Sequence, residues 1–85
     1  MQRSELRSAV VEVLVRLLKV APDIDPAADL ADHGLTSLES VSLVLMLEDR
    51  FDIDLPDHAL MLDNFTSVDK IVDLLNSHLE AEAQA

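Results

Sequence analysis

Apolar side chains recur at intervals of three and four residues along most of this chain, the spacing that places them on one side of a helix. In the first segment, for which Ser4 is a candidate cap, this stripe consists of Leu6, Val10, Val13, Leu14 and Leu17. Near the end of the chain it consists of Val68, Ile71, Val72, Leu75 and Leu79. No run alternates polar and apolar residues long enough to predict a strand, so the pattern predicts an all-α fold.

Prolines and capping residues predict where the first two helices end and begin. Pro22 and Pro26 lack a backbone donor and predict a long loop after the first helix. We expect Leu30 to anchor this loop to the core, because an unanchored loop would lose more entropy on ordering than its contacts return. Thr36, with Glu39 three residues later, forms a capping-box pattern, which predicts that a second helix starts there.

The second half of the chain predicts two more helices. We expect the second helix to end at Phe51, and Pro56 then favours a short third helix near 57–62. Residues 64–67 should end that helix, and their hydroxyl side chains can cap the last one. The predicted architecture is a four-helix bundle with three longer helices and one short third helix.

Composition limits the size and class of the protein. The 85 residues support one domain with one modest core, which we place at residues 1–80 and follow with a frayed tail at 81–85. Hydrophobic residues make up 49% of the chain, enough to fold despite a net charge of −11. The absence of cysteine excludes disulfides, a thiolate nucleophile and a thiolate zinc site.

The charge balance also limits the partners. Seventeen acidic residues against six basic ones would repel nucleic acid and anionic lipid, whereas basic protein surfaces would be attracted. Charged residues interrupt the N-terminal stretch, which therefore predicts neither a targeting signal nor a membrane span. We expect a cytoplasmic monomer that binds neither nucleic acid nor membranes.

The second predicted helix carries more apolar surface than one core requires. At about 100° per residue, one arc consists of Leu43, Val44, Leu47 and Phe51. A second arc consists of Leu38, Val41 and Leu45. Glu39, Glu48 and Asp49 flank this second arc with negative charge. The second arc could pack under the loop or the third helix, but three apolar residues with an acidic rim better fit a small surface for a partner.

Ser37 occupies the first helical position after Thr36. There its hydroxyl is exposed, and the free amides and dipole of the helix start favour negative charge such as a phosphate ester. Gly34, the only glycine, allows a close approach or an unusual backbone angle three residues earlier. From composition alone, the pattern favours an ordinary turn glycine and an ordinary first-turn serine.

These residues belong to a longer motif. The chain reads Asp29-Leu30 and then GLTSLESVSLVLMLEDRFDIDLPD, which resembles the acyl carrier protein and peptidyl carrier protein family. The matching positions are Gly34, Ser37, Leu38, Val41, Leu43, Leu47, Glu48, Phe51, Ile53 and Pro56. Phe65, Ser67, Val68 and Ile71 resemble the start of the family's last helix. Thr36 stands where the family usually has aspartate, and can cap the helix but cannot offer a carboxylate to a modifying enzyme.

The resemblance implies a function for these residues. A phosphopantetheinyl transferase would attach 4′-phosphopantetheine from coenzyme A to the Ser37 hydroxyl, and the arm's thiol would hold an acyl or aminoacyl group as a thioester. The protein would then be a carrier and not an enzyme, delivering its cargo within a specialised biosynthetic pathway. In its stand-alone form and in having Thr36, the chain resembles discrete carriers of specialised pathways. These include carriers that dedicated ligases load with amino acids.

The resemblance also implies partners and their docking residues. Besides the transferase, these are a loading ligase or acyltransferase and a downstream synthase or transferase with a basic surface. They would dock on Leu38, Glu39, Val41, Leu45, Glu48 and Asp49. Four residues are candidates to line a space for a cargo chain, with core packing as the alternative: Val44, Met46, Leu47 and Leu62.

Other functions fit less well. The spacing of Asp52, Asp54, Asp57 and Asp63 suggests a calcium loop, but Asp57 falls where such a loop needs glycine and Asp63 where it needs glutamate. The three histidines lie in separate predicted elements, so we expect no metal site. A small helical chain also offers little substrate cleft for a hydrolase. The remaining alternative is a small acidic interaction module without a prosthetic group.

Overall fold

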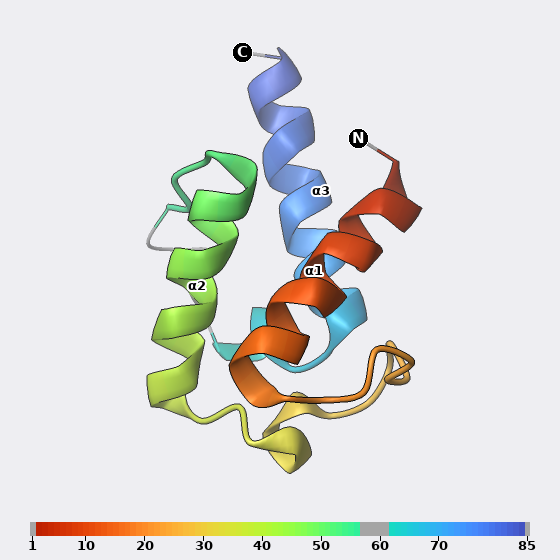
Figure 1. Cartoon of the computed structure of the whole chain (residues 1–85). Helices are drawn as coiled ribbons and strands as arrows, with labels where there is room; N and C mark the ends of the chain where they lie inside the picture. The colour runs from red at the N-terminus through yellow and green to blue at the C-terminus, as the bar shows by residue number, and fades with distance from the viewer. Residues whose placement is uncertain (1, 57–61, 85) are drawn as a thin grey trace.

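The computed structural model describes residues 2–56 and 62–84, and within these ranges the chain forms three α-helices and two short 3₁₀ helices. In chain order the elements are α1 (Arg3–Leu18), η1 (Leu30–His33), α2 (Ser37–Phe51), η3 (Leu62–Phe65) and α3 (Val68–Gln84). Figure 1 shows that the long connection between α1 and α2 lies at the opposite end of the molecule from the two termini. The predicted all-α fold is confirmed.

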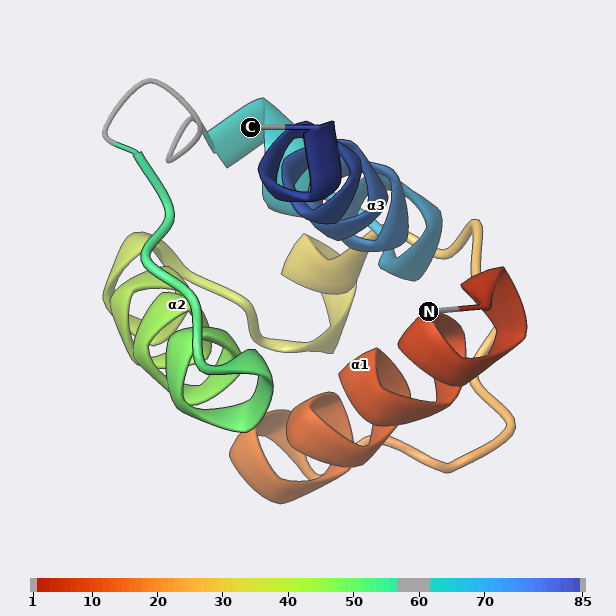
Figure 2. The same cartoon turned by 90° about the horizontal axis from the view of Figure 1, so that it is seen from above.

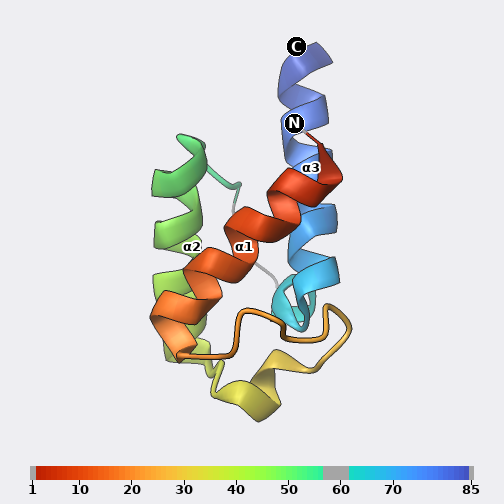
Figure 3. The same cartoon turned by 45° about the vertical axis from the view of Figure 1, so that its right-hand side comes forward.

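The three long helices enclose a common interior. α1 packs against both α2 and α3, and Figure 3 shows it running obliquely across the other two. In the view from above, the helices surround the interior and η1 is seen between α2 and α3 (Figure 2). η1 lies at the end of the molecule opposite the termini, where its Leu30 is fully buried (Figure 1).

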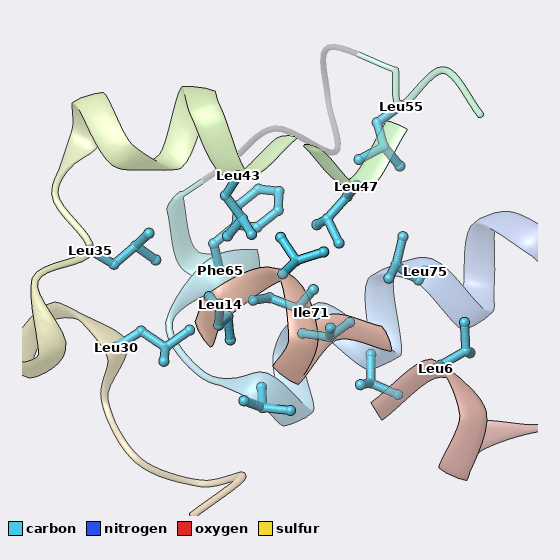
Figure 4. Close-up of a cluster of buried hydrophobic side chains, with 14 of the residues drawn as sticks. Leu6, Leu14, Leu30, Leu35, Leu43, Leu47, Leu55, Phe65, Ile71 and Leu75 are labelled. Atoms are coloured by element: carbon cyan, nitrogen blue, oxygen red, sulfur yellow. The ribbon is translucent and has the colours of Figure 1, made fainter. Parts of the chain in front are cut away.

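The core consists of aliphatic side chains and one phenylalanine. Phe65 is buried together with leucines from all three α-helices, as Figure 4 shows. The largest fully buried side chains are Phe65, Leu6, Leu14, Leu30, Leu43, Leu47, Ile71, Leu75, Val10, Val68 and Val72. Within the described ranges no polar or charged residue is buried, so apolar packing provides the main stabilisation of the fold.

Ion pairs join the helices at the surface. Two pairs link α1 to α3: Arg3–Asp73, with a nitrogen–oxygen distance of 2.7 Å, and Arg7–Asp69, at 3.5 Å. A third pair, Arg50–Glu12 at 3.8 Å, links α2 to α1. All these side chains are exposed, and each such pair contributes at most about 1 kcal/mol. The pairs therefore add little to the stability of the helix packing.

The long loop is anchored as expected. Leu30 is fully buried and Ile24 is half-buried against the core. Two backbone hydrogen bonds tie the loop to the start of α3: Leu30 N–H donates to the Thr66 carbonyl at 2.8 Å, and Asp69 N–H donates to the Pro26 carbonyl at 3.0 Å. The loop also contains η1, which the proline pattern did not indicate. These contacts hold the segment that leads into α2.

Several predicted boundaries are confirmed or corrected by the structure. α2 spans the predicted residues, and Ser67 caps α3 by accepting a hydrogen bond from Lys70 N–H at 3.2 Å. Ser4, the candidate cap of the first helix, instead lies inside α1, because the helix begins at Arg3 and Gln2 takes the cap position. Position 2 supplies no side-chain capping bond, so the start of α1 depends on packing.

The region after α2 and the C-terminal end also differ from expectation. The predicted short helix near 57–62 lies outside the described residues except for Leu62, and the four-helix count stays a prediction. We expected residues 64–67 to end that helix; residues 64–65 instead belong to η3, and residues 66–67 are the non-helical ones before α3. α3 continues to Gln84, so residues 81–84 of the expected frayed tail are helical. Alanine and glutamate favour helix strongly enough to extend it there.

Candidate functional site

The start of α2 is fixed by its own side chains. Thr36 has extended backbone angles and its Oγ1 accepts a hydrogen bond from Glu39 N–H at 3.4 Å. The Thr36 hydroxyl in turn donates to the Glu39 carboxylate. Glu39 therefore reaches back as predicted, although its partner is the threonine hydroxyl and not the backbone N–H of a standard capping box. The helix start is a well-defined N-terminus.

Ser37 is the exposed first residue of this helix. Its side chain makes no hydrogen bond to any residue in the described ranges, whereas the Ser40 hydroxyl donates to the Thr36 carbonyl at 2.9 Å. The free backbone N–H groups of the first turn and the helix dipole favour negative charge at this end. Ser37 thus offers an accessible oxygen at a place that stabilises an anion.

Gly34 directs the chain into α2 through its backbone conformation. Its φ is +97°, in the left-handed region, where its N–H closes η1 by donating to the Ala31 carbonyl at 3.2 Å. A Cβ added at this position would meet no atom within 4 Å. Of the two sequence interpretations, the unusual backbone angle is therefore confirmed, and no close approach requires glycine here.

α2 presents two different apolar faces, as predicted. Leu43 and Leu47 are fully buried, whereas Leu38, Val41 and Leu45 are 75%, 60% and 61% exposed. We call these last three residues the exposed apolar face. They are the exposed large hydrophobic residues of the described chain, and they follow one another along one side of a single helix. Such a contiguous patch is typical of an interaction surface.

The acidic residues expected around this face differ in their surroundings. Glu39 is half-buried and bonded to Thr36, while Asp49 is exposed. Asp49 also lines a pocket between α1 and α2, together with Glu12, Val13, Arg16, Met46 and Arg50. The predicted rim therefore extends from the helix start to the α1–α2 seam.

Glu48 has a structural role that the sequence did not reveal. It is half-buried, and its Oε2 accepts a hydrogen bond from Leu55 N–H at 2.9 Å. Its backbone carbonyl accepts a second bond, from Ile53 N–H at 3.0 Å. One residue thus holds the extended segment that follows α2. Its position one turn before the helix end, ahead of a segment with free backbone donors, is the signal that indicates such a bond.

Removing the Glu48 carboxylate should therefore reduce stability. We expect Glu48→Ala to lower the free energy of unfolding by about 1.5–3 kcal/mol, because a charge-assisted hydrogen bond to the backbone is lost. Asp49→Ala is the matched control, since this neighbour is exposed, and should change it by less than about 0.5 kcal/mol. Urea denaturation of both variants measures the difference. Equal values would show that the Leu55 bond contributes nothing.

A groove of about 420 Å³ begins at Ser37 and follows α2. Its lining residues are Ser37, Ser40, Val41, Val44, Leu45, Glu48 and Phe65. Among the candidates to line a space for cargo, Val44 lies in this groove, Leu47 is buried in the core, and Met46 lines the pocket between α1 and α2. The side chain of Leu62 lies outside the described part of the chain.

Searches for two other kinds of site were negative within the described ranges. No group of three or more histidine, cysteine, aspartate or glutamate side chains there is placed to hold a metal ion. In the same part of the chain, no helix has the length and apolar character required to span a bilayer.

Comparison with known proteins agrees with this geometry. The family model described as "Phosphopantetheine attachment site" matches residues 8–75. The aminoacyl carrier protein of Agrobacterium fabrum is 32% identical over 83 residues, covering 94% of this chain and all of that protein. Aminoacyl carrier protein 1 of Bradyrhizobium diazoefficiens is 29% identical over 96% of this chain and 94% of its own length. Mitochondrial acyl carrier protein 2 of Arabidopsis thaliana is 36% identical, and the match spans 65% of that protein.

The fold has a solved counterpart. The crystal structure of an engineered Bradyrhizobium japonicum glycine:[carrier protein] ligase complexed with carrier protein from Agrobacterium tumefaciens and AMP contains a similar chain. It matches with a TM-score of 0.75 and 36% identity, over 82% of this chain and 97% of the other. A structure of that complex with ATP gives a TM-score of 0.76 and 35% identity. From its sequence, its helical fold and these matches, the chain belongs to the family of carrier proteins that bear a covalent 4′-phosphopantetheine group and hold acyl or aminoacyl cargo.

Proposed function

We propose that Ser37 is the residue to which 4′-phosphopantetheine is attached, and that the cargo is an aminoacyl group. The observation that carries the proposal is the exposed Ser37 hydroxyl, which is free of hydrogen bonds to the described residues and stands at the start of α2. It lies inside the region that the family model matches. The serine hydroxyl and the anion-stabilising helix start both fit a phosphodiester.

The chain's own residues prepare this attachment. Thr36 and Gly34 set the direction of the helix start, and the amides of the first turn stabilise the negative charge of the phosphate. The Ser37 oxygen gives its proton to a base of the transferase and bonds to the pantetheine-bearing phosphorus of coenzyme A, as the phosphoanhydride bond breaks and adenosine 3′,5′-bisphosphate leaves. When attached, the arm supplies a terminal thiol that carries the cargo as a thioester. The tether keeps that cargo at high local concentration near a docked enzyme.

The aminoacyl assignment rests on the similar proteins. Two of the similar proteins are named aminoacyl carrier proteins, and the solved counterpart is complexed with a glycine:[carrier protein] ligase. We therefore propose an aminoacyl-loading ligase as one partner, alongside a phosphopantetheinyl transferase and a downstream acceptor enzyme. We further propose that the protein is a non-catalytic, cytoplasmic monomer. Its domain would span residues 1–80 and include a fourth short helix.

The exposed apolar face is the proposed docking surface for these enzymes. Glu39, Glu48 and Asp49 would meet lysine or arginine side chains on each partner. Because Glu39 and Glu48 also bond to Thr36 and Leu55, Asp49 is the most available charge of the three. Rim charges speed encounter more than they lengthen residence, and salt screens them. Weak, salt-sensitive docking suits a carrier that must leave one enzyme for the next.

Intact mass spectrometry tests the proposed attachment. After incubation of the unmodified chain with coenzyme A and a broad-specificity transferase, we expect a mass gain of one phosphopantetheine group, mapped to Ser37 by peptide sequencing. An unchanged mass would refute the attachment and favour an acidic interaction module. Modification mapped to another serine would refute the assignment of the residue. Material from the native host should in addition carry the proposed aminoacyl load.

Replacing Val41 with aspartate tests the docking surface. Val41→Asp removes apolar area from an exposed site, so we expect it to change unfolding by less than about 0.5 kcal/mol. It should lower kcat/KM for loading by about tenfold or more, because a central contact contributes more than about 1.4 kcal/mol to binding. Ser77→Asp adds the same charge on the exposed side of α3 and is the control. Undiminished loading of a folded Val41→Asp protein would contradict the proposed surface.

A further inference from the structure

Phe65 forms the floor of the groove that begins at Ser37. It is only 1% exposed, yet it lines this groove together with residues of α2. Figure 4 shows its ring extending from η3 toward Leu43 on the inner side of α2, and the two elements are in contact. The ring thus separates the groove from the interior of the helical bundle.

The interior behind this floor is already filled. Leu43 and Leu47 of α2, Leu14 of α1 and Ile71 of α3 are all fully buried. Leu43 and Leu47 do not line the groove, so the groove stops short of the inner face of α2. Protein interiors are packed as densely as organic crystals, and extra methylene groups force side chains out of their preferred rotamers. From this groove, a long alkyl chain would reach the described core by displacing the Phe65 ring.

The groove itself suits a different kind of cargo. Val41 and Leu45 form an open wall, since both are more than half exposed, and Ser40 and Glu48 add polar groups. A small group resting there keeps contact with water. This matters for an aminoacyl group, because its free ammonium would be costly to bury in an apolar core.

We propose that Phe65 determines cargo size by closing the interior, so that this carrier holds small groups in the open groove and does not take a long acyl chain into its core. The inference rests on the proposed attachment at Ser37. Phe65 is a specificity-determining residue in this proposal, and it takes no part in forming or breaking the thioester.

Thermal stability of loaded chains provides the test. A broad-specificity transferase with acetyl- or octanoyl-coenzyme A would place each acylated arm on Ser37 of the wild type, and intact mass would verify loading first. For the wild type we expect the two loaded forms to differ in Tm by less than about 2 °C. A buried octanoyl chain would instead raise Tm by about 4 °C or more relative to acetyl, because several methylene groups leave water.

Replacing Phe65 with a smaller residue should open space in the interior for a long acyl chain. In Phe65→Ala we expect octanoyl to raise Tm by about 4 °C or more over acetyl, since the alkyl chain fills the cavity. If Phe65→Ala does not fold, the milder truncation Phe65→Val takes its place in the experiment. Leu6→Ala is the control, because Leu6 is fully buried but lies at the far end of the core from Phe65 (Figure 4). It should lower Tm for both loaded forms equally.

Two results would overturn the role of Phe65. One is an octanoyl-dependent rise in the wild type, which would show that the interior already admits a long chain. The other is the absence of such a rise in a folded, loaded Phe65 variant. Both arise only on chains whose mass confirms modification at Ser37, so they leave the proposed attachment intact. Failure of modification itself would refute the attachment.

Discussion

Replacing Ser37 with alanine is expected to abolish phosphopantetheine attachment completely. The side chain supplies the only oxygen through which the proposed phosphodiester at this position can form. Because Ser37 is exposed and its hydroxyl bonds to none of the described residues, the free energy of unfolding should change by less than about 0.5 kcal/mol. Intact mass after incubation with coenzyme A and a transferase measures attachment, and urea denaturation measures stability.

Two other serines of α2 are matched controls for this variant. Ser40→Ala removes a hydroxyl that lines the same groove but donates to the Thr36 carbonyl, and Ser42→Ala removes an exposed one. Both variants should still gain the full mass. If Ser37→Ala gained as much mass as the wild type, the attachment would lie elsewhere. If it failed to fold, the low structural importance assigned to this hydroxyl would be wrong.

Leu47→Ala is expected to cause a large loss of stability, lowering the free energy of unfolding by about 2–5 kcal/mol. Leu47 is fully buried on the inner face of α2, where truncation leaves a cavity that the close-packed core fills only in part. For a domain of this size each kcal/mol corresponds to about 4–8 °C in Tm. Urea and thermal denaturation followed by circular dichroism measure the loss.

Leu45→Ala provides the contrast, because the same chemical change is made two residues away on the opposite side of the helix. Leu45 is 61% exposed, so its truncation should change stability by less than about 0.5 kcal/mol. It should instead weaken loading by the partner enzyme. A small loss for Leu47→Ala, or equal losses for both variants, would contradict the assignment of the two faces of α2.

Much of the proposed site could be predicted from local sequence. Thr36 and Glu39 identify the start of α2 because a capping box is a contact between residues three positions apart. The two faces of the helix follow from its periodicity, which requires no knowledge of the neighbouring elements. Capping also places Ser37 at an exposed position, whereas the resemblance to the carrier motif identified it as the candidate attachment residue.

Other features depended on contacts between distant or irregular segments. The bond from Leu55 to Glu48 exists because the chain after α2 folds back on the helix, a path that no periodic pattern describes. The sequence likewise did not distinguish among the residues proposed to line a cargo space. Only the folded chain shows that Val44 lines the groove whereas Leu47 is buried in the core. At the end of the chain we expected a frayed tail, but residues 81–84 continue α3, because alanine and glutamate favour helix.

The sequence by itself determined the all-α class, the limits and faces of α2, and the exposed position of Ser37 directly after the helix cap. These properties depend on backbone hydrogen bonds and side-chain spacing within a few residues. Only the tertiary structure showed that Phe65 lines the groove that begins at Ser37, and that the Glu48 carboxylate accepts a hydrogen bond from the backbone of Leu55. The first depends on how segments distant in sequence pack together, and the second on an irregular segment that folds back on its own helix; local periodic patterns describe neither.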